Sequence, residues 1–188
     1  MSWSRRRVLK AGGALVGVSA AALLAASARG RDAAAHGAQS SRRIALKNLH
    51  TDERVDIEYY RDGAYLSEAL ASIEVLLRDF RTGERHPIDP VLMDYLVDVA
   101  GTLQVDPSFK VISGYRSPHT NAQLRERSTG VAQHSLHMEG RAIDVRMNGV
   151  DCASLAAHAE DLKRGGVGYY RASDFVHLDT GAFRIWKG

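Results

Sequence analysis

The first regular pattern of hydrophobic and polar residues along the chain is a two-residue alternation. Val55, Ile57 and Tyr59 alternate with charged residues, which is typical of a half-buried β-strand. Asp62-Gly63 follows as a strong turn signal, and another short hydrophobic run begins at Ala64. This segment is predicted to form a small β-hairpin.

The spacing then changes to steps of three and four residues, which indicates two amphipathic helices. Hydrophobic residues from Leu66 to Phe80 place one apolar stripe along a helix of about four turns. Asp89-Pro90 supplies an N-cap and a first-turn proline for a second helix, whose hydrophobic spacing continues to Leu103. Both helices are expected to serve as scaffold.

Short β-prone runs separated by glycines characterise the second half of the chain. They span Phe109–Tyr115, Ala142–Met147 and Phe175–Leu178, and they carry polar residues where a plain core strand would be apolar. A further helix is indicated by the hydrophobic spacing from Leu155 to Leu162 and is closed by Gly165-Gly166. We therefore expect a single α+β domain, with an antiparallel sheet and the helices packed on one side.

The N-terminal segment has the residue order of an export signal. Basic residues within Ser4–Lys10 precede a small-residue apolar run, Ala11–Ala26, which falls short of the roughly 20 apolar residues that a spanning helix needs. The paired arginines resemble the twin-arginine signal, with Val8 where that pattern usually has Phe. Ala26-Ser27-Ala28 fits a cleavage site, and an uncleaved anchor is the alternative.

These patterns divide the chain into three parts. We expect a twin-arginine-type signal peptide at 1–28, a flexible tether rich in Ala, Gly, Ser and Gln at 29–42, and the folded domain at 43–188. The exported protein is then periplasmic or associated with the cell wall, with no membrane span in its mature form. The sequence leaves its oligomeric state open.

Removal of the signal changes the charge balance. The chain has 25 Lys and Arg against 22 Asp and Glu, and the signal holds four of the basic residues and none of the acidic ones, which leaves 21 against 22, a net charge of −1. Without a basic excess, nucleic acid is not expected as a partner. The single cysteine, Cys152, excludes an intramolecular disulfide and is expected to be a buried small hydrophobe.

Three residues of the second half form a candidate metal-ligand set. Catalytic zinc takes three protein ligands and keeps one position for water. His137 and Asp144 are seven residues apart, with Gly140 between them to let the chain turn, and His177 lies within a β-prone stretch. Each residue alone is a weak signal, because a lone histidine or aspartate is more often structural or solvated.

A longer motif strengthens this interpretation. The segment Ser135–Asp144 matches the Ser-x-His-x-x-Gly-x-Ala-x-Asp signature of M15 zinc peptidases. Together with Ser113–Ser117 and Phe175–Gly181, it makes residues 43–188 resemble that group, and within it the murein endopeptidase K branch, also called DUF882. The group is structurally akin to the hedgehog domain, and the resemblance implies one zinc ion, at the open face of the sheet, held by His137, Asp144 and His177.

The resemblance also implies catalytic roles. Arg116 would bind the substrate and stabilise the developing oxyanion. Asp174, three residues before the last histidine, is expected to be the general base, and Asp179 the residue that orients His177, with Asp179 as the alternative general base. Strict strand alternation puts Asp174 on the face opposite His177, so the inward position requires a strand that begins at or after residue 175.

Further residues are candidates for substrate binding or for support of the ligands. These are Tyr115, Ser135 and His134, which belong to the motif segments or flank them. The predicted function is zinc-dependent hydrolysis of peptide bonds in peptidoglycan stem peptides, by a murein cross-link endopeptidase that takes part in cell-wall remodelling. A D-Ala-D-Ala carboxypeptidase is the alternative, and a catalytically silent zinc-containing peptidoglycan-binding module is the alternative of another class.

Overall fold

The computed structural model describes residues 41–127 and 131–188. The predicted signal peptide and all but the end of the predicted tether lie outside the described residues. The first strand, β1, spans Ser41–Asn48 and begins just before the expected start of the domain at residue 43. Among the described helices, none combines the length and the apolar character needed to cross a membrane.

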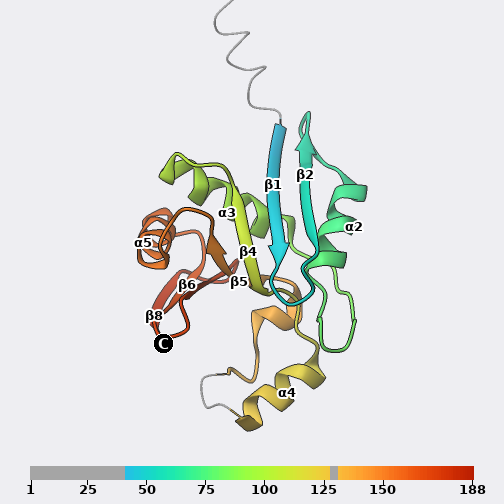
Figure 1. The fold of residues 1–188 in the computed structure, drawn as a ribbon, viewed down its shortest axis with the longest axis vertical. Coiled ribbons are helices and arrows are strands. Elements are labelled where there is room, and N and C mark those ends of the chain that lie inside the picture. Colours follow the sequence, from blue (N-terminus) through green and yellow to red (C-terminus); the bar gives the residue numbers. More distant parts are fainter. Residues whose placement is uncertain (1–40, 128–130) are drawn as a thin grey trace, which may run out of the picture. The chain divides into compact units, whose positions relative to one another are not determined.

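The described residues form one open eight-stranded sheet in the order β3-β2-β1-β4-β5-β7-β6-β8 (Figure 1). Its strands after β1 are β2 (Arg54–Arg61), β3 (Ala64–Tyr65), β4 (Ser108–Ser113), β5 (Ala142–Met147), β6 (Gly166–Tyr170), β7 (Phe175–Asp179) and β8 (Arg184–Lys187). The predicted hairpin is confirmed as the antiparallel pair β2 and β3.

The sheet is mixed. An antiparallel sheet was expected, and this is wrong for two pairs of adjacent strands. β1 is parallel to β4, and β6 is parallel to β8, whereas the other pairs are antiparallel. The chain leaves β1, forms the hairpin and two helices, and returns to the same sheet in the same direction, which a long crossover permits. The hydrophobic pattern did not predict strands at β6 and β8. Their parallel pairing therefore could not be predicted from the sequence.

Three α-helices and the sheet share one hydrophobic core, as expected for the α+β class. They are α2 (Ser67–Leu76), α3 (Pro90–Leu103) and α5 (Cys152–Leu162). Cys152 is 4% exposed and belongs to that core, as predicted. Ile143 and Val145 of β5 point into the core, so Asp144, which lies between them, faces the opposite side of the sheet.

The helix predicted from Leu66 to Phe80 ends early, at Leu76. Asn48 donates its side-chain amide to the Leu76 carbonyl at 3.0 Å, and the N–H of Tyr115 donates to the Leu77 carbonyl at 2.7 Å. Tertiary partners therefore take the carbonyl groups that another helical turn would use. By contrast, α3 begins where predicted, with Asp89 as its N-cap, accepting from the N–H of Val91.

A fourth helix, α4 (Pro118–Arg127), and a short 3-10 helix, η1 (Leu136–Glu139), were not predicted. α4 is almost entirely polar, so it lacks the apolar stripe that indicates a helix. Both elements follow the strand β4 in the chain and lead into β5. They carry the segments that surround the candidate site.

Candidate metal centre

The predicted metal ligands come from three different elements. His137 lies on η1, whereas Asp144 and His177 face each other on the neighbouring strands β5 and β7. Gly140 ends η1 with a φ of +66°, a left-handed conformation that suits glycine, and a Cβ there would overlap the carbonyl of Pro87. The turn expected between His137 and Asp144 is therefore present.

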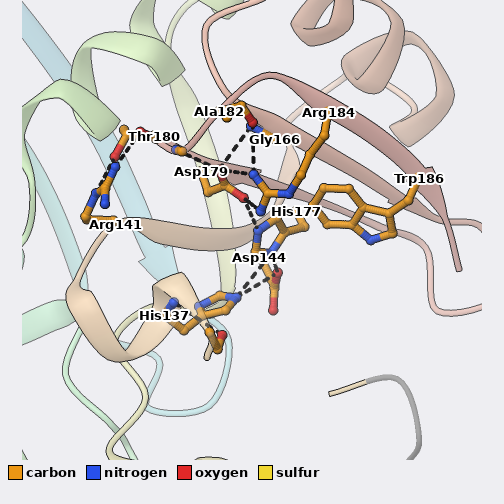
Figure 2. Close-up of polar contacts among 12 residues, drawn as sticks. His137, Arg141, Asp144, Gly166, His177, Asp179, Thr180, Ala182, Arg184 and Trp186 are labelled. Carbon is orange, nitrogen blue, oxygen red and sulfur yellow. Dashed lines mark hydrogen bonds and ion pairs between the residues drawn. The ribbon is translucent and has the colours of Figure 1, made fainter. Parts of the chain in front are cut away.

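The three side chains converge on one point, which Figure 2 shows. Asp144 Oδ1 lies 2.9 Å from His177 Nδ1 and 3.3 Å from His137 Nε2, and the two histidine nitrogens are 3.2 Å apart. All three residues are buried, and their donor atoms lie within 4.8 Å of one another. We call these residues the His-Asp-His cluster.

Hydrogen bonds behind the cluster fix which nitrogen of each histidine faces it. His137 Nδ1 lies 2.7 Å from the carbonyl oxygen of Gly114, which can only accept, so Nδ1 carries the proton and Nε2 is left as a ligand. His177 Nε2 lies 3.0 Å from Asp179 Oδ2, which leaves Nδ1 toward Asp144. Once a metal displaces the proton shared by His177 and Asp144, the set offers two neutral imidazoles and one carboxylate, which fits a divalent metal such as zinc.

Charge and burial act against each other in the cluster. Burial favours the neutral form of Asp144, but the neighbouring His137 and His177 outweigh it and hold the pKa of Asp144 well below its ordinary value. Burial lowers the pKa of His137. For His177, burial is outweighed by hydrogen bonds to Asp144 and Asp179, which raise its pKa to about 9. The cluster thus keeps an ionised carboxylate in a buried position, as a cation site requires.

Asp179 is fully buried behind His177 and is surrounded by donors. Besides His177, it accepts from the N–H groups of Gly166 and Gly181 at 3.0 and 2.8 Å, and from Arg184 at 2.6 Å. Burial opposes its ionised form, yet these hydrogen bonds lower its pKa. It therefore lies where a residue that orients His177 is expected, and this role stays a prediction.

Arg116 lies beside the cluster with an incompletely paired guanidinium. Its Nη2 is 3.8 Å from Asp144 Oδ2, its Nη1 donates to Asn121 Oδ1 at 3.4 Å, and its buried Nε has no partner among the described residues. Burial lowers its pKa, against the attraction of Asp144. Asn121, on α4, also donates to the carbonyl of Ala132 at 3.1 Å and so connects Arg116 to another segment of the site.

A pocket of about 500 Å³ opens over the cluster. Ser135 and His134 line it, as does Arg116, so these sequence-predicted residues are brought together. Ser135 also caps η1, because its hydroxyl accepts from the N–H of His137 at 3.4 Å. Eight further lining residues were not predicted, and four of them lie on β6, β7 and β8: Tyr170, Phe175, Arg184 and Trp186.

Two expected site residues lie elsewhere. Tyr115 is 8% exposed and stacks on His86 at 4.8 Å between ring centroids, so it packs as a core residue outside the pocket lining. Asp174 is exposed and pairs with Arg146 at 3.3 Å. β7 begins at Phe175, as an inward Asp174 requires, but Asp174 has a φ of +52° and its carboxylate does not line the pocket. The carboxylate of Asp174 therefore does not reach the cluster in this structure, and its role as general base stays a prediction.

Comparisons with known proteins agree with this geometry. Residues 36–186 match a family model of M15 peptidases described as peptidoglycan L,D-endopeptidase MepK. The chain belongs to this M15 family. The peptidoglycan L,D-endopeptidase MepK of Escherichia coli strain K12 is 39% identical over 183 residues, which cover 97% of each chain.

A second relative has the same description. The probable peptidoglycan L,D-endopeptidase MepK of Haemophilus influenzae is 40% identical over 146 residues, 77% of this chain and 78% of that one. No solved structure matches the chain. Membership of the M15 family makes this protein a metal-dependent peptidase, and the His-Asp-His cluster is the group of described residues that is able to hold the metal.

Proposed function

We propose that this protein is a zinc-dependent endopeptidase that cuts peptide cross-links between peptidoglycan stem peptides. The observation that carries the proposal is the buried His-Asp-His cluster at the base of an open pocket, with the Arg116 guanidinium beside it. The names of the two relatives supply the substrate class, since both are described as peptidoglycan L,D-endopeptidases.

Zinc is the proposed metal, with one ion per chain held by His137, Asp144 and His177. Two imidazoles and one carboxylate suit zinc and leave a position open. When bound, zinc supplies Lewis-acid chemistry that activates water and polarises a peptide carbonyl. The chain contributes ligand orientation, through the Gly114 carbonyl behind His137 and the Asp179 carboxylate behind His177.

Arg116 is proposed to bind the substrate carbonyl as negative charge develops on its oxygen. Its partial pairing leaves N–H donors for a ligand, and its burial strengthens each interaction with an anion. With Asp174 turned outward as in this structure, another group would carry the proton. Among the described lining residues outside the cluster, His134 has a side chain that is able to accept a proton and return it.

Export through the twin-arginine pathway remains part of the proposal. The sequence of residues 1–28 supports it, and a substrate in the cell wall requires a periplasmic or wall-associated enzyme. The part of the tether before β1 would then separate the cleavage site from the peptidase domain.

The test is digestion of purified peptidoglycan by the exported protein, with zinc or with a chelator, and identification of the products by mass. We expect loss of cross-linked dimers that depends on zinc. Intact dimers with released D-Ala would replace the endopeptidase by a carboxypeptidase. No product despite one bound zinc per chain would indicate the silent binding module.

A further inference from the structure

A single row of residues crosses four strands of the sheet at the metal centre. Asp144 on β5 is opposite His177 on β7, His177 is opposite Gly168 on β6, and Gly168 is opposite Trp186 on β8. Residues in register across neighbouring strands point to the same face. Trp186 therefore belongs to the face that carries the metal ligands, although β8 is two strands away from His177.

The glycine in this row allows the tryptophan to reach the site. Gly168 has no side chain, and a Cβ built on it would overlap the indole of Trp186. The ring thus lies over β6 in the space that a side chain would fill. Its centroid is 5.1 Å from that of the His177 ring, at an interplanar angle of 53°, and Figure 2 shows it next to this ligand.

Neighbouring side chains hold the indole in place. Its N–H donates to the hydroxyl of Tyr170 at 3.0 Å, and Tyr170 stacks on Phe175 at 4.5 Å with an interplanar angle of 13°. The guanidinium of Arg184 lies 5.1 Å from the indole centroid while it is paired with Asp179. We call Tyr170, Phe175 and Trp186 the aromatic wall, and all three line the pocket.

The wall offers apolar ring surface next to a metal ligand, and three aliphatic side chains add to the apolar part of the lining. Arg116, His134 and Ser135 are polar or charged and suit carbonyl and carboxylate groups. Aromatic surface instead suits methylene groups, because burying them removes apolar area from water. The pocket therefore separates polar from apolar parts of a ligand.

In a cross-link between stem peptides, the amide nitrogen sits at the end of the side chain of a diamino acid. The substrate thus presents a run of methylene groups close to the bond to be cut, whereas a terminal D-Ala presents one methyl group and a carboxylate. We propose that the aromatic wall binds this methylene chain and so favours cross-links over chain termini. The inference rests on the proposed function and assigns Trp186, with Tyr170, as a specificity-determining residue.

The test compares two synthetic substrates with the same acyl part. In the long substrate the scissile amide is made with the side-chain amine of a diamino acid, and in the short one it is made with methylamine. Trp186→Ala should lower kcat/KM for the long substrate about 10-fold, roughly the effect of losing contact with two buried methylene groups. For the short substrate the change should stay within about 2-fold, and the zinc content should not change.

Two other variants keep the test decisive if Trp186→Ala folds poorly. Tyr170→Phe removes only the hydroxyl that accepts from the indole, and it should give a smaller loss confined to the long substrate. Ile185→Ala, on the same strand, is the control, because Ile185 is 48% exposed and does not line the pocket.

The outcomes distinguish failure of the proposed function from failure of the role assigned to the aromatic wall. If the wild-type protein cleaves neither substrate, the proposed function fails, and this inference fails with it. A second result is possible if the wild type cleaves the long substrate. If Trp186→Ala and Tyr170→Phe then lower kcat/KM equally for both substrates, or lower it for neither, only the role of the aromatic wall is overturned.

Discussion

Asp179 and His177 are two residues apart on β7, and the Asp179 carboxylate lies 3.0 Å from Nε2 of His177, on the side of the ring away from Asp144. Both side chains point to the same face because the strand alternates. A carboxylate behind a metal-binding imidazole fixes the ring and raises its basicity. Asp179 thus occupies the position expected from the sequence, whereas Asp174 faces outward and pairs with Arg146.

The first prediction compares these two carboxylates. Asp179→Asn should weaken zinc binding or lower turnover by about 10- to 100-fold, because the orienting acceptor behind His177 is lost. Asp174→Asn should change turnover by no more than about 2-fold, since Asp174 is exposed and paired with Arg146. Zinc titration and kcat of both variants check this. Loss of turnover in the Asp174 variant alone would restore Asp174 as the general base.

The second prediction concerns Arg116. Replacing it with Ala should lower kcat by about 10²- to 10³-fold, because a donor beside the developing oxyanion is lost. The zinc content should stay at one per chain, since Arg116 Nη2 is 3.8 Å from Asp144 and contributes no ligand atom. Arg125→Ala, an exposed position on α4, serves as the charge-matched control. A fall in zinc content that accounts for the lost activity would assign Arg116 a structural role instead.

The third prediction concerns Asn121, which is 3% exposed and connects Arg116 to the carbonyl of Ala132. Asn121→Ala should reduce kcat/KM by about 10-fold, the effect of one lost hydrogen bond to a charged group. In a double-mutant cycle with Arg116→Ala, the two losses should not add, because both act through the same guanidinium. Additive losses would show that Asn121 acts independently. Gln123→Ala, exposed on the same helix, is the control.

The fourth prediction concerns stability at low pH. Asp79 is 1% exposed and accepts from the N–H groups of Ser117 and Arg81 at 3.0 Å each. Burial raises the pKa of its carboxyl, but hydrogen bonds donated to it outweigh burial and lower the pKa below its ordinary value. The resulting stability is present above the unfolded pKa of about 4 and is lost as the pH falls through the folded pKa.

Asp79→Asn should therefore reduce the free energy of unfolding by about 1 to 3 kcal/mol at pH 7. The difference from the wild type should shrink as the pH falls below about 4. Urea unfolding of both proteins measures this difference in the free energy of unfolding. A chelator is present throughout to remove effects of bound metal. A difference that is the same at all pH values would exclude the carboxylate charge as its cause.

The fifth prediction uses two glycines with similar backbone. Gly140 and Gly149 have φ values of +66° and +75°, but a Cβ on Gly140 would overlap the Pro87 carbonyl, whereas nothing lies within 4 Å of one on Gly149. Gly149→Ala should cost about 1 kcal/mol from the left-handed conformation alone. Gly140→Ala should cost more and also weaken zinc binding, because it shifts η1 and His137. This prediction would be contradicted if thermal unfolding showed the same loss of stability in both variants and Gly140→Ala left zinc binding unchanged.

Local patterns were sufficient for much of the scaffold. The Asp62-Gly63 turn, the Asp89-Pro90 start of α3 and the β5 strand at Ala142–Met147 occur as predicted, because turn, cap and strand signals act between neighbouring residues. The end of α2 was misplaced, since it depends on Asn48 and Tyr115, which are distant in the sequence.

The sequence by itself determined the class of the fold, the three residues of the His-Asp-His cluster and the resemblance to M15 peptidases, because the spacing of His137 and Asp144 around a glycine is a local feature. Only the tertiary structure decided that Asp174 turns outward to Arg146, and that Trp186 reaches the site over Gly168. The physical reason is that both outcomes depend on the order and register of strands. Pairing between strands is set by long-range packing, which the pattern along one strand does not contain.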